Sequence, residues 1–493
     1  MTDAQFQAWL DSHDAEPVTL YRLGAWSASA GGEVVRRLSN RAYKRADAAT
    51  PYAAAIAADL VASEAITADG KGRVSAGEVK IWNIDGERTS WLGDVFCNRD
   101  IEVLLGDLRW PESDFRRMFL GKIEDVSSSA SSPDTEPMLI VKVRDAMDRL
   151  NTPVTELTMG DGSIHPTTFG ECPNITPKHA GAGALSGEYT YHPTATEGTI
   201  RAAVDGMTRE AVQDLPSSGS IIYQTAIGPG AVTLSVQGDK TGGVYRRTIA
   251  QIVRLLVQSY GDPADRFTDA EIDLDNFTAF DGAHPYAVGL YLTDRTLVID
   301  ACARLAASVR AQLVPSMTGK LRLLRARVPG SATGAITAGQ YQTGTLVQAV
   351  RHKVVAAVNL GYCRNYTPQP SLVTRLAPEL KAILAQEWRA VQRVNETTVA
   401  RYRMTRVAAM AETCLLNKED ASVEAYARLD EDSTQRYTYR ITGTRSLLLQ
   451  TLGQGVVLYG NEFDLQNGKI GQIRSREINF DYRNLTVNTE ITI

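Results

Sequence analysis

The chain has 493 residues, and its 52 Lys plus Arg against 57 Asp plus Glu give a formal net charge of -5. This balance leaves no cationic excess to neutralise phosphates and so excludes a general nucleic-acid-binding protein. The length predicts three or four domains. A hydrophobic content of 43% indicates a folded globular protein rather than a disordered one.

Neither the N-terminus nor the cysteines indicate export. Residues 1–16 lack the basic stretch followed by an apolar stretch that marks a secretory signal, so we expect synthesis in a cytoplasm. The most apolar early segment, residues 51–66, is interrupted by Asp59 and Glu64, and no membrane span is predicted. The five cysteines are widely spaced and odd in number, which argues for reduced thiols rather than a disulfide framework.

The first 150 residues have the pattern of β-strands. Apolar residues alternate with polar ones around residues 18–20, 79–81, 101–105 and 139–143, which predicts strands with one buried face in a barrel or sandwich. In the strand at residues 78–84, Trp82 and Ile84 lie on the face opposite Val79 and Ile81. That second apolar face suits a subunit interface, although burial of both faces within a sandwich explains it as well.

The middle of the chain changes character twice. Residues 151–240 are rich in proline, which predicts a loop-rich insert with short strands at 221–226 and 231–236 joined across 228–230. Helical spacing then begins. Thr248 is the expected N-cap of a helix that ends before Gly261, and further helices are expected over 295–313 and from Pro378.

The C-terminal residues return to the pattern of strands, expected at 445–449, 456–458, 470–478 and 485–493. The fold class is therefore α+β and β-rich, with several domains, β-barrel domains at both ends, and a loop-rich insert and a few amphipathic helices between them. The expected domains are residues 1–150, 151–240, 241–350 and 351–493.

No group of residues carries a catalytic signature. The acidic stretch at 262–281 lacks the Gly and Glu positions of a calcium-binding EF-hand loop. His165, His179, His192 and Cys172 share the proline-rich insert and are the best zinc candidates, but surface histidines and a buried thiol explain them more simply. We expect no enzymatic activity, no cofactor and no metal.

Short motifs spread over most of the chain resemble, in the same order, the baseplate hub or tail-tip proteins of long-tailed, siphovirus-like bacteriophages. They lie at residues 77–86 (GEVKIWNIDG), 101–106 (IEVLLG), 119–126 (FLGKIEDV), 167–177 (TTFGECPNITP), 189–192 (YTYH), 289–292 (GLYL), 319–323 (GKLRL) and 452–458 (LGQGVVL). Composition and residue spacing alone predict a β-rich chain but no function. The resemblance to this family is what suggests one.

The resemblance implies a structural virion protein, a homotrimeric hub at the distal end of the tail, assembled in the host cytoplasm. Each chain would contribute two tube-like β-barrels, so that three chains offer a quasi-sixfold ring to the hexameric tail tube and help to close or open the tail channel. The implied partners are distal tail and tail-tube rings and central tip or fibre proteins. DNA would pass through the ring without sequence-specific binding.

Two sets of residues are candidates for contacts. Trp82, Trp91, Trp110 and Phe119 are the candidate subunit-interface residues, with a core role as the alternative for each. The competing function is a tail-associated protein that binds glycans or degrades the cell wall. In its glycan-binding form, Tyr189, Tyr191 and His192 would contact a sugar ring; in its hydrolase form, a Glu/Asp pair or a metal site would be needed.

Overall fold

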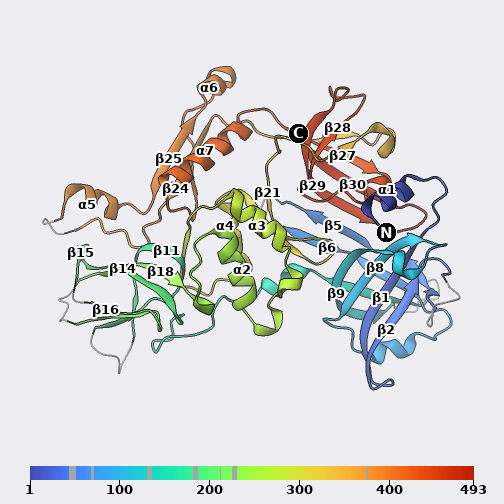
Figure 1. The fold of residues 1–493 in the computed structure, drawn as a ribbon, viewed down its shortest axis with the longest axis horizontal. Coiled ribbons are helices and arrows are strands. Elements are labelled where there is room, and N and C mark those ends of the chain that lie inside the picture. The colour runs from blue at the N-terminus through green and yellow to red at the C-terminus, as the bar shows by residue number, and fades with distance from the viewer. Residues whose placement is uncertain are drawn as a thin grey trace. The chain divides into compact units, whose positions relative to one another are not determined.

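The computed structural model describes residues 1–43, 51–67, 72–129, 136–180, 187–210, 212–224, 230–372 and 376–493. The chain forms two compact units, and each is assembled from separate stretches of sequence. The first unit contains Met1–Asp148, Leu313–His352 and Arg436–Ile493, and the second contains Arg149–Gln312 and Lys353–Gln435. Figure 1 shows the helices and strands of both units as a ribbon coloured along the chain.

The first sheet of the first unit has eight strands and curls into a nearly closed barrel. Its order is β3 (Ala53–Ala54), β2 (Gly32–Ser39), β1 (Pro17–Ser27), β8 (Asp100–Asp107), β9 (Arg116–Ser128), β10 (Met138–Arg144), β7 (Glu78–Trp82) and β4 (Ile56–Ala58). The two edge strands, β3 and β4, are separated in the chain only by Ala55. Because adjacent Cα atoms are 3.8 Å apart, this single residue keeps the two edge strands close together, and the sheet is nearly closed.

The second sheet of this unit gathers strands from distant parts of the chain. Its main path is β22 (Gly334–Ile336), β28 (Gly455–Leu458), β29 (Lys469–Asn479), β30 (Thr486–Thr492), β27 (Tyr437–Gly443) and β23 (Val347–Arg351). The hairpin β5 (Val61–Ala65) and β6 (Arg73–Ala76) also joins it, because β5 pairs with the second half of β29. Figure 1 shows β5 and β6 beside β29 and β30.

One apolar core extends through both sheets. Period-two alternation places Val79 and Ile81 of β7 in this core, with Asn83 buried after them, and leaves Ile84 63% exposed. The same core includes Val456 of β28 and Ile491 of β30. The alternation predicted from the sequence is therefore confirmed here, and both sheets are stabilised by the same interior.

Helix α1 (Asp3–Asp11) packs onto the first unit. Thr2 and Gln5 form a capping box at its start, and the helix buries Phe6, Trp9 and Leu10. The Trp9 indole N–H donates to the Asp107 carboxylate over 2.8 Å. An N-terminal segment that would otherwise fray is thus held on the barrel.

The second unit contains three antiparallel or mixed sheets and six helices among the described residues. Its sheets are β15 (Met207–Thr208), β14 (Thr196–Val204), β18 (Val232–Asp239), β11 (Thr167–Ile175) and β19 (Gly289–Leu292); β12 (Lys178–His179), β13 (Glu188–Thr190), β17 (Ser220–Tyr223) and β16 (Val212–Leu215); and β25 (Arg389–Val394), β24 (Ala357–Tyr362) and β26 (Met410–Glu412). Its helices are α2 (Ile249–Ser259), α3 (Leu274–Ala283), α4 (Val298–Ala307), α5 (Pro378–Ala385), α6 (Glu396–Tyr402) and α7 (Lys418–Asp432). A short ribbon of β20 (Ala311–Pro315) and β21 (Leu321–Arg325) belongs to the first unit from Leu313 onward.

The helix predicted after Thr248 is confirmed as α2, with Thr248 as its N-cap residue and Gly261 just beyond it in the left-handed region. The helix predicted over 295–313 is shorter than expected. The chain turns at Arg310, which has a φ of 53°, and the residues after it form β20. The predicted helix was too long because β20, which follows the turn, is also buried and therefore also rich in apolar residues.

Three further expectations need correction. The apolar spacing after Pro378 continues to Val391 and predicts a helix of that length, but the helix ends at Ala385 and Val391 lies in β25. Residues 445–449 do not form a strand, because Arg445–Leu447 is a 3-10 turn. The proline-rich insert is more regular than expected, because it supplies all strands of the four-stranded sheet and four of the five strands of another. A bulge near Pro173, with Asn174 at a φ of 48°, accommodates that proline in β11. The turn predicted at 228–230 lies largely outside the described residues.

Candidate functional site

The four candidate interface aromatics occupy different environments in the first unit. Phe119 is buried in the core that the two sheets share. Trp110 packs on Trp9, with 4.6 Å between ring centroids, and the Arg36 guanidinium lies 5.2 Å from the Trp91 ring centroid. Trp82 is half-buried on β7. The core role is therefore the better explanation for Phe119, while the three tryptophans keep part of their surface in solvent.

The candidate glycan contacts are mostly inside the second unit. Tyr191 and His192 are fully buried. Tyr189 is half-buried, and its ring meets Tyr223 edge-on at 5.9 Å between centroids. Neither Tyr191 nor His192 can offer a ring face to a sugar in this structure, so the glycan site drawn from these residues needs correction.

His192 belongs instead to a buried polar cluster. Its Nδ1 atom accepts the Thr168 backbone N–H over 3.1 Å, and its Nε2 atom lies 3.4 Å from the Asp239 carboxylate. Tyr260 donates its hydroxyl hydrogen to the same carboxylate over 2.5 Å. Burial raises the pKa of Tyr260 well above its usual value, and the adjacent negative charge of Asp239 adds to the rise.

The cluster satisfies buried charge and does not resemble a catalytic centre. Burial alone would raise the pKa of Asp239, but hydrogen bonds from His192, Tyr260 and Thr241 outweigh it and hold that pKa below its usual value. Because Asp239 and His192 have at most 1% of their surfaces exposed, no substrate reaches them in this conformation. Sequence reasoning singled out His192 but had no local signal for Asp239 and Tyr260, which are distant in the chain.

The zinc candidates do not gather into a site. Among the residues that the structure describes, no three His, Cys, Asp or Glu side chains are placed to share a metal ion. Cys172 is buried, and burial raises its pKa, so the thiolate that a metal requires is disfavoured. No helix within the described ranges is long and apolar enough to cross a membrane.

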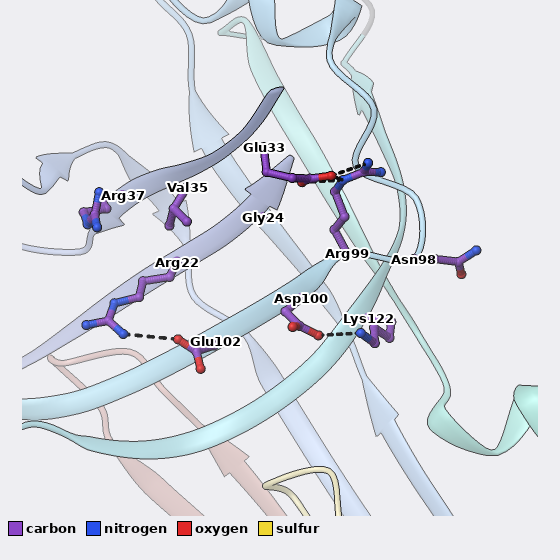
Figure 2. A pocket seen from close by; sticks show the side chains of 10 residues that line it. All are labelled: Arg22, Gly24, Glu33, Val35, Arg37, Asn98, Arg99, Asp100, Glu102 and Lys122. Carbon is purple, nitrogen blue, oxygen red and sulfur yellow. Dashed lines mark hydrogen bonds and ion pairs between the residues drawn. The ribbon is translucent and has the colours of Figure 1, made fainter. Parts of the chain in front are cut away.

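A groove of about 610 Å³ lies on the outer face of the barrel (Figure 2). It is lined almost entirely by charged and polar side chains from β1, β2, β8 and β9 and from the turn before β8. The lining residues are Arg22, Gly24, Glu33, Val35, Arg37, Asn98, Arg99, Asp100, Glu102 and Lys122.

The strand register explains why these charges face outward together. Leu23 and Ile101 are opposite each other and point into the core, so their neighbours in the pleat face solvent. Arg22 is therefore opposite Glu102, and the two side chains approach to 3.3 Å. Gly24 has no side chain to fill the space beside them.

Most charges in the groove have a partner of opposite sign. Lys122 lies 2.7 Å from Asp100, and Arg99 lies 2.8 Å from Glu33. The hydrogen bond from Arg99 lowers the pKa of Glu33. With four basic and three acidic side chains, most of them paired, the groove is a polar surface with little net charge.

No protein-family model matches the sequence, and no curated protein matches it. In structure the chain is similar to a tail protein from Neisseria meningitidis MC58, at 9% identity and a TM-score of 0.43 over 97% of each chain. It is similar to the 43 kDa tail protein of prophage MuSo2 from Shewanella oneidensis, at 9% identity and a TM-score of 0.38 over 97% of this chain and 96% of that chain. It is also similar to the E. coli c3393 protein, a component of the type VI secretion system with structural similarity to the T4 bacteriophage tail proteins gp27 and gp5, at 8% identity and a TM-score of 0.35 over 91% of this chain and 75% of that chain. Each likeness is a distant one.

Proposed function

We propose that this protein is a structural subunit of a bacteriophage tail, namely a hub at the distal tip that joins the hexameric tail tube to the tip and helps to close or open the channel. Its working form would be a homotrimer in the virion, assembled in the host cytoplasm. The observation that carries the proposal is the pairing of two large sheets in one unit, each reaching eight strands when the β5–β6 hairpin is counted with the second. Two such sheets are what the hub resemblance implies for each chain.

The physical reason for this arrangement is a mismatch of symmetry. A ring of three identical chains has three identical contact surfaces unless each chain presents two similar modules. Two sheets per chain give six modules to a sixfold neighbour. The groove of paired charges on the barrel is compatible with docking against another polar ring.

The edges of the second sheet also favour assembly. Strand β23 lies at one edge, and its Val347 and Val350 side chains are 45% and 47% exposed. An exposed strand edge with apolar side chains is a site for pairing with another chain, and assembly into a ring removes it from solvent. This feature supports a subunit that completes its packing only within a larger particle.

The proposal is tested by gold-labelled antibody microscopy on purified particles from a lysate that contains the protein. Label confined to the distal end of the tail supports a hub, and pre-immune antibody is the control for background. Label along the whole tail contradicts a tip location. Label absent from intact particles, with the protein left in the soluble lysate, contradicts the structural role altogether.

A further inference from the structure

A strongly basic, exposed arm projects from the three-stranded sheet of the second unit. We define the basic arm as residues 388–410, which include β25, helix α6 and the chain leading to β26. It has five arginines and one glutamate, a net charge of +4 in a chain whose total is -5. Figure 1 shows α6 at the tip of this arm, beyond the end of β24 and β25.

Most of the arginines on the basic arm have no acidic partner. Arg406 pairs with Glu396 at 3.0 Å. Within the described part of the chain, Arg389, Arg393, Arg401 and Arg403 have no carboxylate at ion-pair distance, and all four are exposed. Arg403 also takes the left-handed conformation that ends α6, with a φ of 53°, at a position where glycine is usual. The charge of Arg403 therefore lies at the exposed tip of the basic arm.

Apolar side chains accompany these charges. Val407 is 80% exposed, and Met410 and Tyr402 are exposed by 38% and 37%. Isolated exposed apolar residues are common, but three within nine positions, on a projecting segment, form a patch that association would bury.

Helix α7 has the complementary surface. Residues 411–435 contain seven carboxylates and two basic residues, a net charge of -5. The helix packs its buried residues against β24 and β25. On its outward side, Glu419, Val423, Tyr426 and Asp430 follow one another at spacings of four, three and four, which places them on one stripe.

The outward stripe of α7 is apolar at its centre and acidic at its ends. Val423 is 56% exposed and Tyr426 is 67% exposed, and both lie between Glu419 and Asp430. The basic arm also combines exposed apolar side chains with charges, and its charges have the opposite sign. We propose that the basic arm of one copy docks on the outward stripe of α7 in a second copy of this chain.

The contact would be heterologous, because the arm and the stripe are different surfaces of the same unit. Such a contact joins copies head to tail and forms a ring when the rotation between them closes. This contact rests on the proposed ring of copies. In that ring, it would hold the second unit of one chain to the second unit of the next. A second copy is the favoured occupant because every chain carries both complementary charges and both apolar patches.

The test measures self-association of the full chain by size-exclusion chromatography with light scattering over a range of concentrations. Reversal of the arm, R401E with R403E, should weaken association at least tenfold, because like charges then face each other. Reversal of the stripe, E419R with Y426R, should weaken it to a similar extent. All these side chains are exposed, so circular dichroism should show an unchanged fold.

The decisive variant combines the two reversals in one chain. Its acidic arm again meets a basic stripe, and association should recover by at least tenfold relative to either reversal alone. The matched control for the arm reversal is R209E with R247E, which makes the same change in net charge as R401E with R403E but at exposed arginines elsewhere in the same unit, and it should leave association unchanged.

Several outcomes overturn the contact while leaving the proposed function to its own test. Association unaffected by either reversal would place the contact elsewhere. A wild-type chain that stays monomeric at all concentrations would exclude a second copy as the occupant in solution. Binding of the arm to duplex DNA, abolished by R401E with R403E while self-association persists, would make a polyanion the occupant. In each case the location of gold label on particles still decides the hub role independently.

Discussion

The two sheets of the first unit reach a similar size by different routes. All strands of the barrel come from the first 144 residues, and most are paired with near neighbours in the chain. The second sheet combines the β5–β6 hairpin with strands from residues 334–351 and 437–492. The barrel is thus largely specified by local sequence, whereas the second sheet exists only when three distant segments meet. Its stability should depend far more on the contacts that hold those segments together.

One of these contacts is a deeply buried ion pair between the β5–β6 hairpin and β29. The Arg476 guanidinium on β29 donates to Glu64 of β5 over 3.0 Å, and its other nitrogen donates to the Leu448 carbonyl over 3.0 Å. Arg322 approaches the second oxygen of Glu64 at 3.4 Å. Glu64 and Arg476 are almost fully buried. Burial lowers the pKa of Arg476, and the charge of Glu64 opposes that shift.

The largest predicted effect follows from removing the charge of Glu64. We expect E64Q to lower the free energy of unfolding by about 3–5 kcal/mol, because it leaves buried guanidinium charge uncompensated. Urea unfolding followed by circular dichroism measures this loss. The matched control is E490Q, which breaks the Arg440–Glu490 pair in the same sheet, where the arginine side chain is 59% exposed. That change should cost less than about 1 kcal/mol. Equal effects of the two substitutions would mean that the buried Glu64–Arg476 pair contributes no more to stability than an exposed ion pair in the same sheet.

A second polar contact lies where the chain passes from the barrel strand β4 to β5. Tyr21 donates its hydroxyl hydrogen to Asp59 over 2.7 Å, and the same hydroxyl accepts the Leu60 backbone N–H over 3.0 Å. Burial raises the pKa of Asp59 to about 6, assisted by the negative charge of Asp481 and opposed by the hydrogen bonds from Tyr21 and Asn40. Protonation of this carboxyl is therefore easier in the folded protein than in the unfolded chain.

The sign of the pH dependence follows from that shift. Because the folded state binds the Asp59 proton more tightly than the unfolded state does, the contribution of Asp59 to stability is greatest below its unfolded pKa of about 3.9 and is lost as the pH rises through about 6. We expect the loss to be about 2 kcal/mol, after allowance for the part of the carboxyl that remains in water. The substitution D59N should remove this dependence between pH 4 and pH 6. Parallel stability curves for the wild type and D59N over that range would contradict the assignment.

A third contact serves the barrel alone. Asp107 accepts the Trp9 indole N–H over 2.8 Å and the Glu16 backbone N–H over 2.9 Å. Burial alone would raise the pKa of Asp107, but hydrogen bonds from Arg109, Glu16 and Trp9 hold it well below its usual value. This contribution is present above the unfolded pKa and is lost as the pH falls through the lower folded value, the opposite of the behaviour of Asp59.

We expect D107A to destabilise the first unit by about 2 kcal/mol, because it leaves buried donors without acceptors. Tryptophan fluorescence during urea unfolding reports the change directly, since Trp9 loses its partner. The control is D11A, in the same helix, where Asp11 is exposed and accepts only from Gln7. A larger effect from D11A than from D107A would show that helix formation, rather than the attachment of the helix, determines the stability there.

The contrast between the sheets also explains what could be predicted from sequence. Alternation over a few residues indicated β7 and β8, and the cap and stop residues Thr248 and Gly261 indicated α2. Both signals are local. The pairing of Glu64 with Arg476 joins positions 412 residues apart, and no pattern near either residue indicates the other.

The candidate sites divide in the same way. His192 stood out by type, yet its partners Asp239 and Tyr260 follow it by 47 and 68 residues, so its burial could not be read from neighbours. The outward charges of the barrel groove had a local signal, because Arg22 and Glu102 occupy the pleat positions opposite the apolar ones. The strand predictions were based on the apolar positions alone, so the charged positions between them did not lead to a predicted groove. The turn at Arg310, between the end of α4 and the start of β20, depends on a left-handed backbone conformation that an arginine in the sequence does not indicate.

The smallest predicted effect on the free energy of unfolding concerns an exposed ion pair in the groove. It gives the value with which the effects of the buried contacts are compared. Lys122 and Asp100 pair at 2.7 Å, at a distance similar to that between Arg476 and Glu64, but their side chains are 39% and 56% exposed. We expect D100N to change the free energy of unfolding by less than about 0.5 kcal/mol, and the change should shrink further as salt is added. The two pairs thus differ in burial and in the second arginine, Arg322, beside Glu64, and the ratio of the E64Q and D100N effects measures what these two features contribute together. A D100N effect as large as that of E64Q would mean that the outer face of the barrel, rather than the junction of its two sheets, holds the first unit together.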